Sequence, residues 1–125
     1  MSTAKYGYWR RLARRLSSDV AELDADDLYR EAEEAGATPA SDCRCGDEVT
    51  VRGRLRSVEL CPKDANATLE AELYDGTDGV TLVWLGRRSI PGIEPGRTIM
   101  VTGRMAVRDG HKVLYNPYYE LQTTS

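Results

Sequence analysis

Between residues 49 and 121 the chain alternates apolar and polar residues in short runs, and turns that contain glycine separate the runs. A period of two places successive side chains on opposite faces of a β-strand. In the first run, Val49, Val51 and Leu55 share one face, and the polar residues between them share the other. The pattern therefore predicts a small antiparallel β domain in which each strand buries one face.

Five runs have the length and residue types of strands. In the first, the apolar phase shifts by one residue at Val58 and Leu60, which predicts a bulge that bends a long strand, and Gly53 would ease the bend. Asp109 and Gly110 predict a tight hairpin turn. The predicted strands cover residues 48–60, 67–74, 80–85, 97–108 and 112–121. The predicted connections are a loop at 61–66, a DGTDG turn at 75–79 and a Gly/Pro-rich connector at 86–96 with room for one helical turn.

The first 40 residues predict an extension of two short helices. In the first, Trp9, Leu12, Ala13 and Leu16 form an apolar stripe, with Arg10, Arg11, Arg14 and Arg15 on the other face. Asp24 is the expected N-cap of the second, acidic helix, whose stripe is Leu28, Ala32 and Ala35 and which ends at Gly36.

Two interpretations of this extension stay open. The basic and acidic helices attract each other and pack on the β domain, or the arginines of the first contact phosphates. Residues 37–47 are expected to be a linker.

A long bent first strand and a connector between the third and fourth strands are typical of a partly open Greek-key barrel. The pattern alone also fits an SH3-like barrel or a small sandwich. The motifs VRGRLRSV, LYDGTDGVTLVWL, IEPGRTIMVTGRM and LYNPYYEL resemble the OB-fold of the anticodon-binding superfamily, especially the wedge domain of the fork-reversal DNA helicases. The whole chain also resembles a family of small stand-alone bacterial OB-fold nucleic-acid-binding proteins. This resemblance implies an all-β class, with a five-stranded Greek-key OB-fold barrel over residues 45–121 after a helical extension over 1–40.

The charge is unevenly distributed along the chain. The net charge is −3, but residues 1–48 hold 7 basic and 11 acidic side chains, whereas residues 49–125 hold 10 and 9. A nearly balanced β domain is not a strong non-specific trap for polyanions. No stretch approaches the roughly 20 apolar residues of a membrane span, and the N-terminus lacks the features of a secretory signal. We therefore expect a cytoplasmic protein with reduced thiols and no membrane partner.

In the OB-folds that the chain resembles, strands 2 and 3 and the loops 1–2 and 4–5 form the binding face. Phosphates there contact basic side chains, and bases stack on aromatic rings. The candidate nucleic-acid-binding residues are Arg52, Arg54, Arg56, Lys63, Tyr74, Arg87, Arg88, Arg108, His111 and Lys112.

Other residues limit this interpretation. Glu70 and Glu72 share the face of Tyr74, so they must pair with arginines or point aside if that face binds, and we expect weak, salt-sensitive affinity. Trp84 is expected in the core, in phase with Val80 and Leu82. The tyrosines at 115, 118 and 119 are expected to close the fold rather than stack on bases.

The motifs of catalysis are missing from the sequence. There is no phosphate-binding P-loop, and Cys43, Cys45, Cys61 and His111 lack the spacing of a zinc site. We expect no enzyme activity, no metal and no cofactor. Two hypotheses follow: a module that binds single-stranded or junction DNA or RNA, or a protein-interaction module that docks a partner or a second copy through the N-terminal helices.

Overall fold

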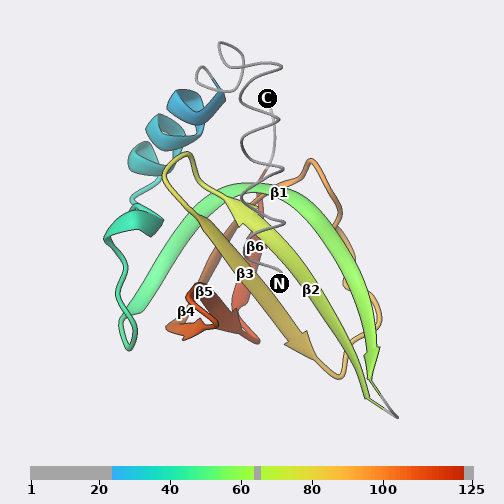
Figure 1. The fold of residues 1–125 in the computed structure, drawn as a ribbon. Helices are drawn as coiled ribbons and strands as arrows, with labels where there is room; N and C mark the ends of the chain where they lie inside the picture. Colours follow the sequence, from blue (N-terminus) through green and yellow to red (C-terminus); the bar gives the residue numbers. More distant parts are fainter. Residues whose placement is uncertain (1–23, 64–65, 123–125) are drawn as a thin grey trace, which may run out of the picture.

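The computed structural model describes residues 24–63 and 66–122 of the chain. These residues form one α-helix over 24–34, a short 3-10 helix and six strands (Figure 1). The 3-10 helix and the strands are η1 (Ala40–Asp42), β1 (Glu48–Lys63), β2 (Asn66–Tyr74), β3 (Gly79–Leu85), β4 (Thr98–Arg108), β5 (His111–Tyr115) and β6 (Tyr118–Leu121). The described part of the chain is therefore all-β with a single helix before the strands, and none of its helices is long and apolar enough to cross a membrane.

Five of the strands pair in a closed ring. The order is β1-β2-β3-β5-β4, and the ring closes because β4 also pairs with β1. The pairing of β3 with β5 is parallel, while the other pairings are antiparallel. The sixth strand, β6, lies outside the ring, on the edge of β4.

β1 closes the ring because it bends far enough to pair with two strands in succession. Its first half pairs with β4 and its second half with β2 (Figure 1). The register with β2 shifts between Leu55 and Ser57, which confirms the predicted bulge. Gly53 lies at the bend, where a Cβ would overlap the carbonyl oxygen of Tyr74. The glycine therefore permits the close approach of the two backbones.

Two of the predicted boundaries are wrong. Residues 61–66 are not a loop, because β1 continues to Lys63 and β2 begins at Asn66. The predicted fifth strand is two strands, interrupted at Asn116, which has a φ of +50°, and Pro117. The Asn116 amide donates to the Val83 carbonyl and its side-chain oxygen accepts from the Leu85 amide, so these bonds hold the chain in a turn.

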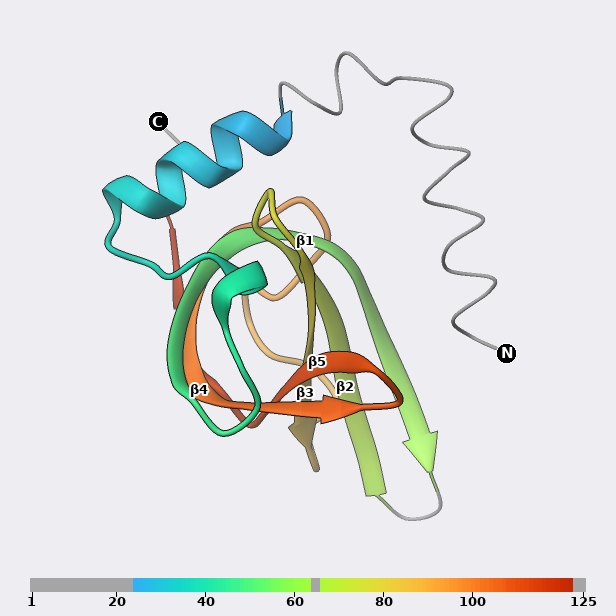
Figure 2. The ribbon, with the colours of Figure 1, turned by 60° about the vertical axis from the view of Figure 1, so that its left-hand side comes forward.

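The acidic helix lies across the outside of the arch of β1 (Figure 2). Leu28 and Ala32 are buried, as predicted, but Ala35 is exposed because the helix ends at residue 34. The expected linker is also packed: Ala40 and Cys43 belong to the core. The first predicted helix, with Trp9 and Leu16, lies outside the described residues.

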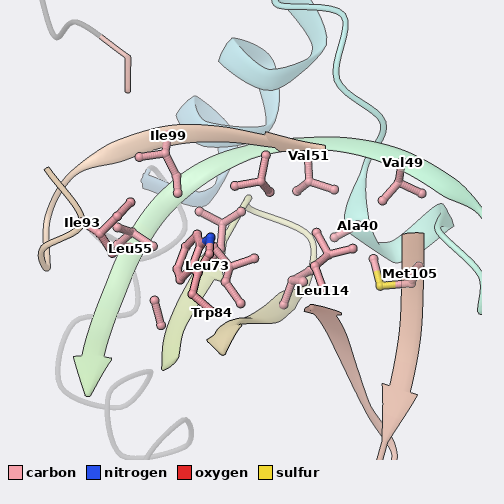
Figure 3. Close-up of a cluster of buried hydrophobic side chains, with 14 of the residues drawn as sticks. Ala40, Val49, Val51, Leu55, Leu73, Trp84, Ile93, Ile99, Met105 and Leu114 are labelled. Carbon is pink, nitrogen blue, oxygen red and sulfur yellow. The ribbon is translucent and has the colours of Figure 1, made fainter. Parts of the chain in front are cut away.

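The interior of the ring is apolar (Figure 3). Most inward residues of the strands are buried as the alternation predicted, and Trp84 is among them, but Leu60 near the end of β1 is 47% exposed. Its indole N–H donates to the Pro117 carbonyl at 3.2 Å. The connector 86–97 has no helix, and it contributes Ile90 and Ile93 to the core. Val107 was expected inside but is 51% exposed, since it lies near the tip of the β4–β5 hairpin.

Candidate nucleic-acid interface

The outer side of three neighbouring strands forms one continuous surface. Glu72 lies opposite Thr81, and Thr81 opposite Val113; in the next row Glu70 lies opposite Val83. Residues opposite each other in adjacent strands share a face. We call this surface the β2–β3–β5 face, and its residues are Glu70, Glu72, Tyr74, Thr81, Val83, Val113 and Tyr115.

The floor of the β2–β3–β5 face is apolar and dry. Val83 and Val113 are almost completely buried, although neither belongs to the cluster that fills the ring. Burial on the outer side of a sheet requires other side chains above it. Charged and aromatic residues from the flanking strands lie around this floor.

One group of such residues is formed by Arg56, Tyr74 and Glu72. The Cζ atom of Arg56 lies 3.7 Å from the centroid of the Tyr74 ring, and Arg56 Nη1 lies 3.8 Å from Glu72 Oε1. The register passes from Leu55 directly to Ser57, so Arg56 is the extra residue of the bulge. The bulge therefore directs this arginine toward the β2–β3–β5 face.

Glu72 is the acid of this group, and its surroundings shift its pKa strongly. Its Oε1 atom is buried and has no hydrogen-bond partner among the described residues. Burial raises the pKa of Glu72 from 4.5 to about 7. An ion pair with Arg56 favours the carboxylate, but at 3.8 Å the contact is too long for a hydrogen bond, so desolvation outweighs it.

A second group is formed by Arg108, Glu70 and Tyr115. Arg108 Nη2 donates to Glu70 Oε1 at 3.3 Å, from the end of β4 to the middle strand β2. Partial burial lowers the pKa of Arg108, but the hydrogen bond and the charge of Glu70, together with Tyr115, outweigh it and raise that pKa. From the sequence, Glu70 and Glu72 were required to pair with arginines or to point aside if this face binds. Both acids pair with an arginine.

These two groups can exchange one anion for another. A guanidinium is a planar donor that fits a carboxylate or a phosphate, and it stacks on aromatic rings. The carboxylates of Glu70 and Glu72 occupy positions where a phosphate could bind. The flanking rings of Tyr74 and Tyr115 could receive bases.

Arg52 and Arg54 are engaged elsewhere. Arg52 donates to Glu31 Oε2 and to Gln122 Oε1, both at 3.2 Å, and its side chain is 13% exposed. Arg54 Nη1 lies 2.6 Å from Asp24 Oδ1. Both contacts with acids attach the helix of residues 24–34 to β1. Arg54 lies opposite Tyr74 in the register, but its side chain and that of Arg52 pair with acids of the helix, whereas Arg56 pairs with Glu72 of β2.

The remaining candidates are scattered. Lys112 Nζ donates to the Ala40 carbonyl at 2.6 Å and pairs with Asp78 at 3.2 Å, so it holds the η1 segment against the ring. His111 lies opposite Arg108 in the hairpin. Arg87 and Arg88 are exposed in the connector after β3 and form no ion pair with any residue of 24–63 or 66–122. The side chain of Lys63 is not among those that the structure describes.

Tyr115 is a residue of the β2–β3–β5 face that the sequence analysis did not place there. It is 44% exposed and belongs to the β2–β3–β5 face, whereas Tyr119 packs edge-on against Trp84, with ring centroids 6.0 Å apart. Tyr118 is 68% exposed, on the edge strand β6. Tyr115, Tyr118 and Tyr119 were all expected to close the fold, but only Tyr119 has a clear structural role. The parallel β3–β5 register places Tyr115, and no local pattern reveals such a register.

The described residues do not meet the requirements of a metal site. Within them, no group of three or more His, Cys, Asp or Glu side chains could hold a metal ion. Cys43 is buried, Cys45 exposed and Cys61 intermediate.

Comparison with known proteins adds a likeness to solved structures. No protein-family model matches the chain, and no curated protein matches it. Among solved structures, the chain is similar to RecG bound to a three-way DNA junction, with a TM-score of 0.57 and 26% sequence identity. The match covers 68% of this chain and 12% of that one, so the chain corresponds to a small part of RecG.

Proposed function

We propose that this chain is an OB-fold module that binds nucleic acid through the β2–β3–β5 face and catalyses no reaction. The observation that carries the proposal is the pair of Arg–Tyr contacts, each closed by a carboxylate of β2. Arg56 lies on Tyr74 beside Glu72, and Arg108 pairs with Glu70 and also interacts with Tyr115. Both arginines can exchange their carboxylate for a phosphate.

The arrangement of strands supports the proposed fold. An OB-fold is a five-stranded, partly open Greek-key barrel that binds nucleic acid on strands 2 and 3 and the loops 1–2 and 4–5. Here five strands pair in a ring, and Arg108 is at the β4–β5 hairpin. The likeness to a part of RecG, which was solved bound to a DNA junction, favours the same ligand class.

Weak, salt-sensitive binding is the expected behaviour, because a phosphate must first displace a carboxylate. Fluorescence anisotropy of a labelled single-stranded DNA, a single-stranded RNA and a forked duplex, at low and moderate salt, tests the proposal. Saturable binding that weakens with salt supports it. The absence of binding at tens of micromolar protein in low salt contradicts it.

Paired variants locate the site. The double variant Arg56→Ala/Arg108→Ala should weaken binding and reduce the log–log salt slope by about 1.4, or about 0.7 for each lost contact with a single strand. The control is Arg97→Ala/Arg104→Ala, which removes two surface arginines paired with Glu94 and Glu48. Its slope should match that of the unmodified protein. Equal losses in both variants would indicate binding through overall charge rather than through the β2–β3–β5 face.

A protein-interaction module is the second candidate. The edge strand β6 favours it, since Tyr118 and Leu121 expose apolar surface beside backbone groups that could pair with another strand. Sedimentation of the pure protein, with and without the Tyr118→Ser substitution, tests for self-association. A monomer that also binds nucleic acid would exclude self-association through this edge.

A further inference from the structure

Glu72 occupies an unusual position for an acid on a ligand-binding surface. It lies between Ser57 of β1 and Thr81 of β3 in the register, and its side chain is only 18% exposed. The Oε1 atom has no hydrogen bond to any described residue, and the Arg56 guanidinium faces it at 3.8 Å. Glu70, one row away, differs because it accepts a hydrogen bond from Arg108.

The Arg56 guanidinium cannot act equally well as the counter-ion of both Glu72 and a phosphate. A phosphate that approaches the guanidinium above Tyr74 competes for the charge that faces Glu72. The carboxylate would then lose its counter-ion in a place where water is scarce, and it would gain a negative neighbour. Both changes favour the neutral acid, since burial and a nearby like charge each disfavour an ionised carboxylate.

We infer that binding of a nucleic-acid strand to the β2–β3–β5 face is coupled to the uptake of one proton by Glu72. The phosphate replaces the Glu72 carboxylate as the counter-ion of Arg56, and the proton comes from solvent. The O–H bond of the acid forms as the bond between the proton and its donor, hydronium or a buffer acid, breaks. The inference rests on the proposed function and adds to it a control by pH.

Glu72 titrates near neutral pH. Burial has already raised its pKa to about 7 before any ligand binds. Tyrosine and arginine change charge far above this range, whereas histidine changes charge within it. The titratable and charged residues on neighbouring positions are Arg56 and Glu59 of β1, Glu70 and Tyr74 of β2, Arg108 of β4, and His111 and Tyr115 of β5. His111 therefore needs its own control.

The first test is the dissociation constant of a labelled single-stranded DNA between pH 5.5 and 8.5, at constant ionic strength. For the unmodified protein, the affinity should be constant below about pH 6 and should fall by up to about tenfold per pH unit above pH 7. Glu72→Gln mimics the protonated acid, so its affinity should vary by no more than about twofold over this range. The controls Glu70→Gln and His111→Asn should keep the pH dependence.

The second test uses the unmodified protein, in case the variant is poorly folded. The heat of binding at pH 7.5 is measured in buffers of different ionisation enthalpy, and its dependence on the buffer gives the number of protons taken up. Because a group with a pKa of about 7 is already partly protonated at pH 7.5, the largest possible uptake is about 0.75 proton. A value well above zero, up to that limit, supports the inference, and a value of zero overturns it.

The outcomes separate the two proposals. Binding without pH dependence, or the same pH dependence in Glu72→Gln, overturns proton coupling through Glu72 and leaves the proposed function intact. No binding at any pH overturns both. A pH dependence lost only in His111→Asn would assign the proton to the histidine and overturn the inference.

Discussion

The Cζ atom of Arg56 lies 3.7 Å from the centroid of the Tyr74 ring. A cation over an aromatic face contributes about 0.5–2 kcal/mol, and it also restricts the arginine before any ligand arrives. Arg56 lies at the bulge in β1, where the register passes from Leu55 directly to Ser57. A backbone irregularity thus determines which arginine of β1 reaches the β2–β3–β5 face.

The first prediction concerns the Tyr74 ring. Tyr74→Leu removes both the surface under Arg56 and a stacking platform, so binding of a single strand should weaken about 5- to 100-fold, in line with about 1–3 kcal/mol for one stacked base. Tyr74→Phe keeps the ring and loses only the long hydroxyl bond to the Gly76 carbonyl at 3.3 Å, so its affinity should change less than about twofold. Anisotropy titrations measure both. Equal affinities of the Leu and Phe variants would exclude stacking on this ring.

The second prediction concerns the pH dependence of stability. The pKa of Glu72 in the fold is about 7, raised from 4.5, so the fold favours the protonated acid. That contribution is complete below about pH 4.5 and is lost as the pH rises through 7. Glu72→Gln should therefore be more stable than the unmodified protein at pH 8, by about 1–3 kcal/mol after allowance for partial solvent access, with a smaller difference at pH 5.5. Urea unfolding at both pH values tests this, with the exposed Glu59→Gln as control. The prediction would be contradicted if the unfolding free energies of Glu72→Gln and the unmodified protein changed equally with pH.

The third prediction concerns the turn under the helix. Gly76 has a φ of +94°, and a Cβ there would overlap the carbonyl oxygen of Ala25 in the helix. Gly46 has a similar φ of +96°, but a Cβ added there would meet nothing within 4 Å. Gly46→Ala should therefore cost about 1 kcal/mol of unfolding free energy from backbone strain alone. Gly76→Ala should cost at least about 2 kcal/mol, since the helix must also move. Similar losses in the two variants, measured by urea unfolding, would show that the helix is not held against the turn.

The fourth prediction concerns Asp75, which is 1% exposed and joins the start of η1 to the turn between β2 and β3. Its carboxylate accepts hydrogen bonds from the Ala40 amide at 2.7 Å, from the Thr77 amide and hydroxyl, and from the Asp78 amide. Asp75→Ala leaves these donors unsatisfied and should lower the unfolding free energy by about 2–4 kcal/mol. Asp47→Ala removes a single exposed bond to the Arg44 amide and should cost no more than about 1 kcal/mol. Thermal and urea unfolding of the two variants provide the comparison. A loss below about 1 kcal/mol for Asp75→Ala would refute its central role.

Several features of the fold could be predicted because they depend on neighbours in the sequence. The bulge in β1 follows from a change in apolar phase around Val58, and the Asp109–Gly110 turn follows from two residues that accept positive φ. Errors occurred where distant contacts determine the local structure. Asn116 ends β5 because its backbone and side chain bond to β3, and Ala40 is buried because Asp75 and Lys112 hold it there.

The candidate site was predicted only in part. Arg56, Tyr74 and Arg108, which the sequence analysis named as candidates, lie on or reach the β2–β3–β5 face, and their role in binding stays a prediction. The pairing of Glu70 and Glu72 with arginines was anticipated as a condition. Arg52 and Arg54 have the same alternation and residue type, but they pair with acids of the helix. Nothing in the residues of β1 distinguishes an arginine that meets Glu31 from one that meets Glu72.

The sequence alone determined which residues of each strand face inward, because the alternation is local and burial of apolar side chains is its physical basis. It also determined that arginines, tyrosines and acids lie on the outer side. The tertiary structure decided how these charges combine. Closure of the ring through β1 and β4, and the parallel register of β3 and β5, bring residues together that are far apart in the chain. Glu72 acquires its raised pKa in the same way, since desolvation depends on what surrounds a carboxylate in space.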